Sequence, residues 1–194
     1  TTTGFIDRFL VSAKAFGVEV ILFFNKVDLY NKKLLSQKEN LMRVYSKIGY
    51  RCMSLSALYD NMNEVKSIVK NKNNIISGHS GSGKSTLINK LLGNSNILTK
   101  EISQRHDQGQ HTTTFSELYR LDFGGTIIDT PGIKGFGLVN IDVDNLSDYF
   151  PEFLSLKQDC KFNNCKHIKE PNCKVKEALE NGQISKDRYS NYLS

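Results

Sequence analysis

The sequence of 194 residues contains no apolar run that approaches the roughly 20 residues a membrane-spanning helix needs. No signal-peptide pattern opens it, and neither an internal repeat nor a low-complexity tract is visible. These absences favour a soluble globular protein. Hydrophobic residues make up 39% and charged residues 24% of the chain, a balance that suits one main core and a small appendage.

The net charge and the cysteines indicate possible binding partners and the cellular compartment of the protein. Twenty-six Lys and Arg against 20 Asp and Glu give a net charge of +6, which favours a polyanionic partner such as nucleic acid but suits a solvated surface equally well. Only four cysteines are present, and three of them crowd between Cys160 and Cys173 beside a histidine. That pattern suits a metal better than a disulfide and predicts a cytoplasmic protein.

The hydrophobic pattern predicts alternating strands and helices up to about residue 133, which is typical of an α/β layer structure with a mostly parallel sheet. From residue 146 onward the pattern changes to short helical pieces around the cysteines. We therefore expect an α/β domain over 1–140 and, around the cysteines, a small metal-binding domain over 141–194. The predicted helices cover 5–15, 36–48, with Ser36 as the cap, 61–70 and 85–92, and the predicted strands cover 18–24, 50–55, 74–77, 115–123 and 125–129.

A glycine-rich loop, GHSGSGKS, starts at Gly78 and fits the pattern G-x-x-x-x-G-K-[ST] at every defined position. It follows a predicted strand and opens a predicted helix, the context that this motif requires. Its glycines let backbone N–H groups turn toward phosphates at the positive end of the helix. Lys84 supplies a charge for the β and γ oxygens, and Ser85 ligates Mg²⁺. The predicted nucleotide contacts here are Gly78, His79, Ser80, Gly81, Ser82, Gly83, Lys84, Ser85 and Thr86.

A second motif, Asn25-Lys26-Val27-Asp28, follows a predicted buried strand. Its side chains should therefore emerge at the carboxyl end of that strand, where α/β sheets bind ligands. Asp28 can accept hydrogen bonds from the N1–H and the exocyclic amine of guanine, a pattern that adenine does not offer. Asn25 would hold the loop or the O6 edge, and Lys26 would lie along the nucleotide.

Ser56 and Ala57 follow the next predicted strand, where they can present a backbone N–H to the guanine oxygen. A surface turn could contain the Asn-Lys-Val-Asp tetrapeptide by accident. The combination of this tetrapeptide, the serine-alanine pair and the phosphate loop favours a guanine nucleotide, GTP or GDP, over ATP.

The stretch Asp129-Thr-Pro-Gly132 follows another predicted buried strand. The aspartate would hold Mg²⁺ through water, and the glycine N–H would meet the γ-phosphate. Between the phosphate loop and this stretch, we expect Thr113 to close over Mg²⁺ in the GTP state. Position 133 holds isoleucine, where many GTPases place a water-orienting glutamine. His111 could orient the water instead, and a loop histidine with no catalytic task is equally plausible.

The metal pattern consists of Cys160, Cys165, His167 and Cys173, three thiolates and one imidazole within a short segment. This set suits tetrahedral Zn²⁺, and four protein ligands leave no open position, so one structural ion is expected. The alternative is a group of reduced cysteines without a metal. Lysines surround the segment, and they either meet RNA phosphates or solvate a small domain. These lysines are Lys157, Lys161, Lys166, Lys169, Lys174 and Lys176.

The order of these motifs, with the base motif first and the phosphate loop later, is that of a circularly permuted GTPase. NKVDL, SGHSGSGKSTLIN, GQHTTT, DTPGIKGFG and the Cys/His pattern resemble those of the RsgA (YjeQ) family, circularly permuted GTPases of small ribosomal subunit biogenesis. The resemblance covers nearly the whole sequence. It implies GTP hydrolysis during maturation of the 30S subunit, contact with ribosomal RNA, no membrane partner and a monomer.

The resemblance also implies an N-terminal OB-fold, for which this sequence has no room, and a sheet strand before the first helix. We expect a sheet without that interior strand to expose two unpaired edges, and the sequence to be an excerpt of a longer protein. Two other functions stay open: a zinc-stabilised RNA-binding scaffold with little nucleotide turnover, and an ATP-using enzyme with the same type of phosphate loop.

Overall fold

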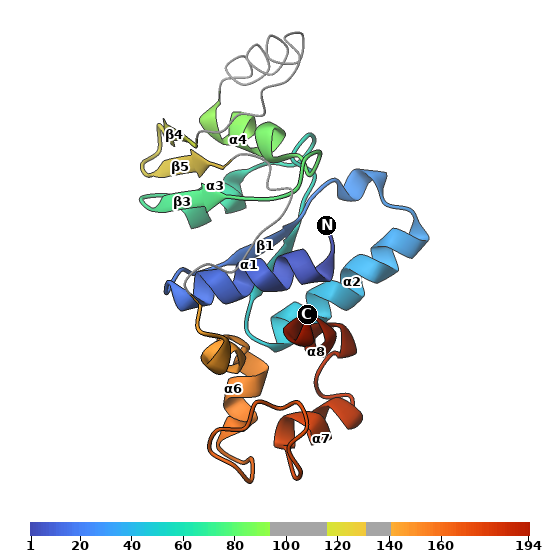
Figure 1. The fold of residues 1–194 in the computed structure, drawn as a ribbon. Helices are drawn as coiled ribbons and strands as arrows, with labels where there is room; N and C mark the ends of the chain where they lie inside the picture. The colour runs from blue at the N-terminus through green and yellow to red at the C-terminus, as the bar shows by residue number, and fades with distance from the viewer. Residues whose placement is uncertain (94–115, 131–140) are drawn as a thin grey trace, which may run out of the picture. The chain divides into compact units, whose positions relative to one another are not determined.

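The computed structural model describes residues 1–93, 116–130 and 141–194 as a series of short strands and helices (Figure 1). The predictions for His111, Thr113 and Gly132 lie outside these residues. The helices are α1 (Thr3–Ala15), α2 (Lys32–Lys47), α3 (Asn63–Val69), α4 (Lys84–Leu92), α6 (Pro151–Lys157), α7 (Lys174–Glu180) and α8 (Lys186–Leu193), with 3₁₀ turns η1 (Val27–Leu29) and η2 (Val143–Tyr149). The strands are β1 (Ile21–Phe24), β2 (Arg51–Ser54), β3 (Asn73–Ile76), β4 (Glu117–Arg120) and β5 (Thr126–Asp129).

The first two helices begin at polar caps. At α1, the hydroxyl of Thr2 accepts a hydrogen bond from the N–H of Phe5 over 3.3 Å. At α2, the side-chain oxygen of Asn31 accepts a bond from the N–H of Leu34 over 3.0 Å, so the helix starts at Lys32. The prediction that Ser36 caps this helix is therefore wrong, because the cap lies one turn earlier.

The strands are divided between two sheets. One contains β1 and β2, and the other has the order β3-β5-β4, in which β3 and β5 are parallel and β4 is antiparallel to β5 (Figure 1). The strand β3 lies at an edge of its sheet, and the expectation that a missing interior strand leaves two unpaired edges stays a prediction. Ile76 is in register with Asp129, so the carboxyl ends of β3 and β5 lie at the same end of the sheet.

The chain divides into two compact units, and each has its own core. The first unit comprises 1–22, 36–53 and the described residues from 141 onward, and the second comprises the described residues of 23–35 and 54–134. Val11 of α1 packs in one cluster with Phe153 and Tyr192 of the C-terminal segment. The second unit buries Ile88 of α4 and Ile127 of β5 completely. The domain boundary predicted at residue 140 lies between the nucleotide motifs and the cysteine-containing segment. It stays a prediction.

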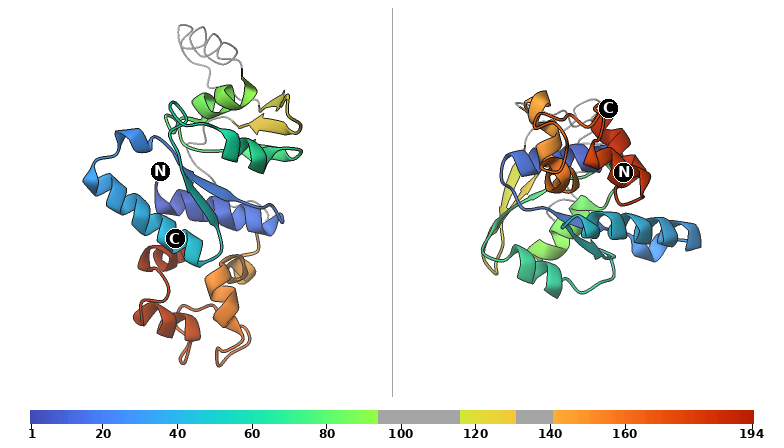
Figure 2. Two further views of the ribbon diagram at one scale, coloured as in Figure 1. Left: turned by 180° about the vertical axis from the view of Figure 1, so that it is seen from behind. Right: turned by 90° about the horizontal axis from the view of Figure 1, so that it is seen from below.

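Figure 2 shows the same elements from behind and from below, with α8 beside α1 in the first unit. Within the described ranges, none of the helices combines the length and the apolarity that a membrane crossing requires.

Candidate nucleotide site and metal centre

Asn25 connects the loop after β1 with two other loops of the second unit. Its side-chain amide donates to the carbonyl of Ser82 over 3.0 Å. Its side-chain oxygen accepts from the N–H of Ala57 over 2.9 Å and from that of Lys26 over 2.8 Å. Lys26 has a left-handed backbone conformation, with φ of 64°, which turns the chain into η1. The base motif, the serine-alanine pair and the phosphate loop therefore meet at one side chain.

The serine-alanine pair is held by further contacts. The N–H of Leu55 donates to the carbonyl of Phe24 over 3.0 Å, and that of Val27 donates to Leu55 over 3.4 Å. The N–H of Ser56 donates to the side chain of Asp60 over 2.7 Å. Ser56 and Ala57, of which one backbone N–H is predicted to meet the guanine oxygen, are buried, and the N–H of Ala57 is bonded to Asn25 in this structure. Asp28 is exposed in η1, on the same loop as Asn25.

The phosphate loop runs between β3 and α4, as the motif predicts. Gly81 and Gly83 have positive φ angles of 78° and 91°. A Cβ atom at Gly83 would lie 2.3 Å from the side-chain nitrogen of Asn25, so only glycine fits here. The N–H of Ser82 donates to the carbonyl of His79 over 3.1 Å, which tightens the loop. His79 is half-buried.

Lys84, the first residue of α4, lies against the end of β5. Its ammonium group is 3.2 Å from a carboxylate oxygen of Asp129 and 3.2 Å from the carbonyl of Thr130. Both charged side chains are mostly buried, with relative exposures of 13% and 19%. The lysine predicted to bind phosphate and the aspartate predicted to hold Mg²⁺ are therefore neighbours, as a single phosphate site requires. Ser85 and Thr86 follow in the first turn of α4.

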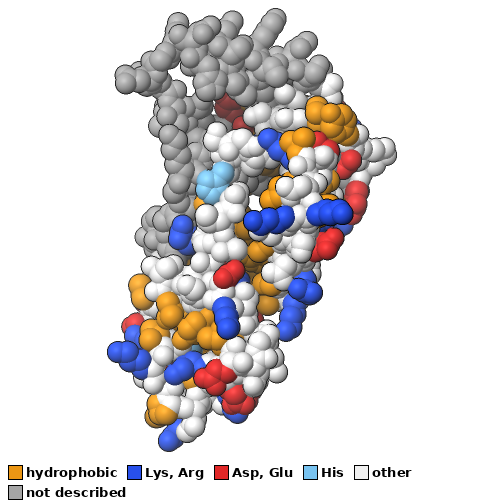
Figure 3. Space-filling view, turned by 90° about the vertical axis from the view of Figure 1, so that its right-hand side faces the viewer, with side chains coloured by type: hydrophobic (Ala, Val, Ile, Leu, Met, Phe, Trp, Pro, Cys, Tyr) orange, Lys and Arg blue, Asp and Glu red, His pale blue; other side chains and the backbone are white. Residues whose placement is uncertain are grey.

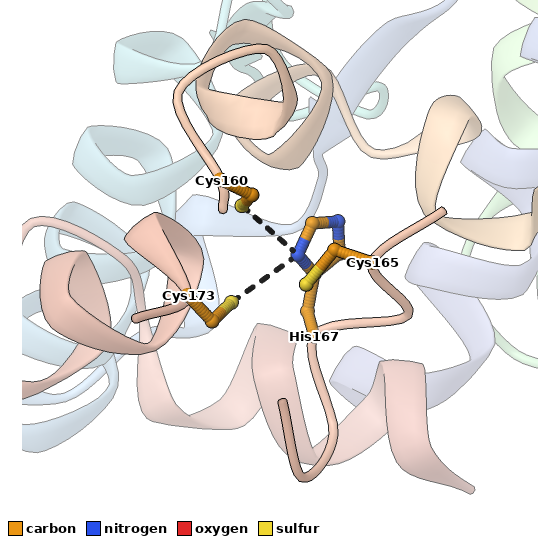
Figure 4. A group of neighbouring side chains, drawn as sticks. All are labelled: Cys160, Cys165, His167 and Cys173. Carbon is orange, nitrogen blue, oxygen red and sulfur yellow. Dashed lines mark hydrogen bonds between the residues drawn. The ribbon is translucent and has the colours of Figure 1, made fainter. Parts of the chain in front are cut away.

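The four predicted metal ligands form a cluster in the first unit (Figure 4). One possible ligand atom from each of Cys160, Cys165, His167 and Cys173 lies within 4.8 Å of all the others, and all four residues are buried. The Nδ1 atom of His167 is 3.7 Å from the sulfur of Cys160 and 3.3 Å from that of Cys173. Zn–N bonds of about 2.0 Å and Zn–S bonds of about 2.3 Å place a nitrogen and a sulfur ligand of a tetrahedral site roughly 3.5 Å apart. The donor set and its spacing thus fit Zn²⁺.

Burial controls the protonation of the cluster. It raises the pKa of Cys165 to about 12 and also raises the pKa of Cys173. It lowers the pKa of His167, so the imidazole is neutral near pH 7 and can act as a ligand. A metal would therefore displace protons from thiols when it binds.

Glu170 holds the loop that carries His167. Its carboxylate accepts from the N–H groups of Lys166 and Ile168 over 2.8 Å and from that of Lys169 over 3.0 Å. Partial burial would raise the pKa of Glu170, but these backbone donors lower it to about 2. The carboxylate is thus a fixed part of the loop at neutral pH.

A comparison with family models assigns the chain to a protein family. Residues 1–139 match the model described as RsgA GTPase. The chain belongs to the RsgA GTPase family. The RsgA model ends before the Cys/His cluster, so the metal centre is supported by its own geometry.

Similar RsgA proteins match along the full chain. This chain is 54% identical to the small ribosomal subunit biogenesis GTPase RsgA of Flavobacterium psychrophilum over 194 residues. It is 51% identical to that of Christiangramia forsetii, also over 194 residues. It covers 60% and 62% of these relatives, so it spans about three fifths of their length.

Two solved structures are also similar. YjeQ from Thermotoga maritima is 36% identical, with a TM-score of 0.82, and the match covers 100% of this chain and 64% of YjeQ. YloQ, described as a circularly permuted GTPase, is 28% identical, with a TM-score of 0.76, and the match covers 100% of this chain and 61% of YloQ. The permuted motif order read from the sequence is thus confirmed as a property of the fold.

Three supporting residues of this RsgA-family chain escaped the sequence analysis. Tyr30 donates its hydroxyl to the carbonyl of Asn25 over 3.0 Å, Asp60 holds Ser56, and Glu170 holds the metal-binding loop. An aspartate four residues after the serine is a weak local signal for a side-chain bond back to the backbone. The other two have no comparable signal.

Proposed function

We propose that this chain is the nucleotide-binding and metal-binding part of a GTPase that hydrolyses GTP to GDP and phosphate during late maturation of the small (30S) ribosomal subunit. The contact of Asn25 with both Ser82 and Ala57 carries the proposal, because it joins the guanine motif to the phosphate loop. The names of the relatives support the ribosomal role. The proposal places the protein in the cytoplasm as a monomer.

The nucleotide would be bound at both of its ends. Asp28 reads the N1–H and the amine of guanine, and Asn25 fixes the loop that carries Asp28. The backbone N–H groups from Gly78 to Ser85 surround the phosphates at the N-terminus of α4. Lys84, which pairs with Asp129 in this structure, turns to the β and γ oxygens when nucleotide binds.

Ser85, Asp129 and Thr113 would hold Mg²⁺, which neutralises charge that develops on the phosphate oxygens. The Lys84–Asp129 contact supports this assignment, since it places a carboxylate beside the phosphate-binding lysine. Gly132 would contact the γ-phosphate, and His111 would orient the attacking water. These two roles and that of Thr113 rest on the sequence motifs.

The Cys/His cluster would hold one structural Zn²⁺, which supplies the stability that so short a segment cannot obtain from its own core. The four ligand atoms leave no position for a substrate. The metal therefore serves the fold of the C-terminal segment.

Ribosomal RNA would contact the surface of this metal-binding segment. Lys161 lies 5.5 Å above the ring of Phe162, whose side chain is 39% exposed, and such a cation and aromatic ring suit an unpaired base and its phosphate. Lys157, Lys166 and Lys174 already form ion pairs with acidic side chains. Figure 3 shows Lys and Arg side chains spread among acidic and apolar ones over the visible face.

The nucleotide assignment is tested by titrating a fluorescent GDP analogue in the presence of Mg²⁺, with GTP and ATP as competitors. We expect GTP and not ATP to displace it. Lys84→Ala should weaken binding by about 10- to 100-fold, since it removes charge-assisted hydrogen bonds. Lys90→Ala, an exposed lysine on the same helix, is the matched control and should bind normally. Equal competition by ATP would overturn the guanine assignment.

The enzymatic and ribosomal parts are tested by single-turnover GTP hydrolysis with and without small ribosomal subunits. We expect the subunits to accelerate hydrolysis and Lys84→Ala to abolish it. Binding without acceleration, and with no effect of Lys84→Ala, would favour an RNA-binding scaffold instead.

A further inference from the structure

The last helix, α8, connects two parts of the first unit through two pairs of side chains. Arg188 and Asn191 reach Asp7 of α1, whereas Tyr189 and Tyr192 reach the loop that carries His167. Each pair has a spacing of three residues, which puts its members on one face of a helix. The helix therefore bonds both to α1 and to the loop that carries His167.

The contact with α1 is a buried ionic network. Arg188 and Asp7 each have a relative exposure of 2%. The carboxylate of Asp7 accepts from Arg188 over 2.6 Å, from the hydroxyl of Tyr45 over 2.8 Å and from the amide of Asn191 over 2.6 Å. The other edge of the Arg188 guanidinium donates twice to Glu152, over 2.8 and 2.9 Å. Water cannot replace these bonds at such burial, so α1 and α8 are held in one relative position.

The contact with the metal-binding loop uses backbone carbonyls. The hydroxyl of Tyr189 donates to the carbonyl of His167, and that of Tyr192 donates to the carbonyl of Lys166, both over 2.7 Å. His167 has a φ of 58°, an uncommon conformation for a residue with a side chain. The two tyrosines thus support the backbone conformation that points the imidazole toward the sulfur atoms.

We propose that α8 couples metal binding at Cys160, Cys165, His167 and Cys173 to the position of α1, with Tyr189 and Tyr192 as positioning residues for the metal site. This inference rests on the proposed zinc assignment. A metal fixes the loop, the loop carbonyls fix the tyrosines, and the same helix then presents Arg188 and Asn191 to Asp7. Because coupling of this kind is reciprocal, disturbing Asp7 must also weaken metal binding.

The first experiment measures hydrogen exchange of the α1 amides in the full chain, with one equivalent of Zn²⁺ and after its removal by a chelator. We expect faster exchange over Thr3–Ala15 without the metal. In the double variant Tyr189→Phe/Tyr192→Phe, which keeps all four ligands, this response should shrink to less than half. Tyr59→Phe, at a ring that is 72% exposed, is the matched control and should respond like the parent.

The second experiment measures Zn²⁺ affinity by competition with a chromophoric chelator. Asp7→Asn should weaken the affinity by about tenfold, since changes outside the ligand set cost 10- to 100-fold. Asp144→Asn, which removes an exposed ion pair with Lys166 beside the loop, should change it less than about twofold.

The outcomes separate the two proposals. Failure to bind one equivalent of Zn²⁺, or equal binding by Cys173→Ala, would overturn the zinc assignment. Stoichiometric binding with unchanged exchange in α1, or with equal affinities for Asp7→Asn and Asp144→Asn, would overturn the coupling alone.

Discussion

The side-chain amide of Asn25 donates a hydrogen bond to the backbone carbonyl of Ser82 over 3.0 Å, across 57 positions of the sequence. Its side-chain oxygen holds Ala57 at the same time. One carboxamide therefore fixes the guanine motif, the serine-alanine pair and the phosphate loop relative to one another. The permuted order of the motifs does not disturb the site, because folding brings their loops to the same place.

Replacing Asn25 by alanine should weaken the binding of GDP by about 30-fold. The change removes two long-range hydrogen bonds worth about 1 kcal/mol each, and about 2 kcal/mol corresponds to this factor. The measurement is the dissociation constant of the fluorescent GDP analogue. Asn40→Ala, which removes an exposed bond to Arg43 on α2, should leave the constant unchanged. Equal constants for the two variants would show that Asn25 does not organise the site.

The variants Gly83→Ala and Gly93→Ala distinguish two effects of a glycine substitution, namely backbone strain and a steric clash of the new Cβ atom. Both glycines have positive φ angles, of 91° and 71°, so each substitution should cost about 1 kcal/mol of stability. A new Cβ at position 83 meets Asn25, whereas a Cβ at position 93 meets no atom of the described residues within 4 Å. Thermal unfolding should therefore show a similar loss of stability in both variants. The affinity for GDP should fall more than about tenfold only in Gly83→Ala. Normal affinity in that variant would refute the close approach.

Local patterns predicted the elements that carry the nucleotide motifs. The strand before the phosphate loop and the helix after it were placed within one residue, because β-branched runs and the glycine loop mark both ends. The strand predicted over 115–123 is shorter, Glu117–Arg120, since Gly124 and Gly125 with φ of 93° and 96° turn the chain. The sequence predicts Ser36 as the cap of α2, whereas Asn31 caps the helix in the structure. Asparagine and serine are both good caps, so only packing decides between the two positions.

The residues that gather in the Cys/His cluster could be predicted, because their residue types are rare and they are closely spaced in the sequence. The contacts that support them could not, since they join positions far apart in the sequence. Asp7 and Arg188 are separated by 181 positions, and neither stands out from ordinary surface charges in a sequence. Burial of a charged residue can be predicted from the sequence only when the residue that pairs with it is known.

Glu170→Gln should reduce stability in a pH-dependent way. The pKa of Glu170, about 2 in the fold, lies below its ordinary value of 4.5. The unfolded chain therefore binds more protons between these values, and the stabilisation is complete above about pH 4.5 and lost as the pH falls toward 2. Urea midpoints of the parent and the variant should differ at about pH 6 and converge toward about pH 3.

Glu177→Gln is the control for Glu170→Gln, because the carboxylate of Glu177 accepts from the side chain of Lys174 on the surface of α7. Its midpoint should follow that of the parent at each pH. A difference between the parent and Glu170→Gln that does not change with pH would show that the backbone donors do not hold the carboxylate.

Arg188→Met tests the cost of leaving buried carboxylates without their cation. Burial would lower the pKa of Arg188, but Glu152 and Asp7 together raise it, so the guanidinium stays charged in the parent. The variant keeps an unbranched side chain but leaves the buried carboxylates of Asp7 and Glu152 without the cation that bonds both of them. Urea denaturation should show a loss of about 3–5 kcal/mol. Lys174→Met, which breaks the exposed pair with Glu177, should lose less than about 1 kcal/mol, and equal losses would mean that burial does not decide the strength of the network.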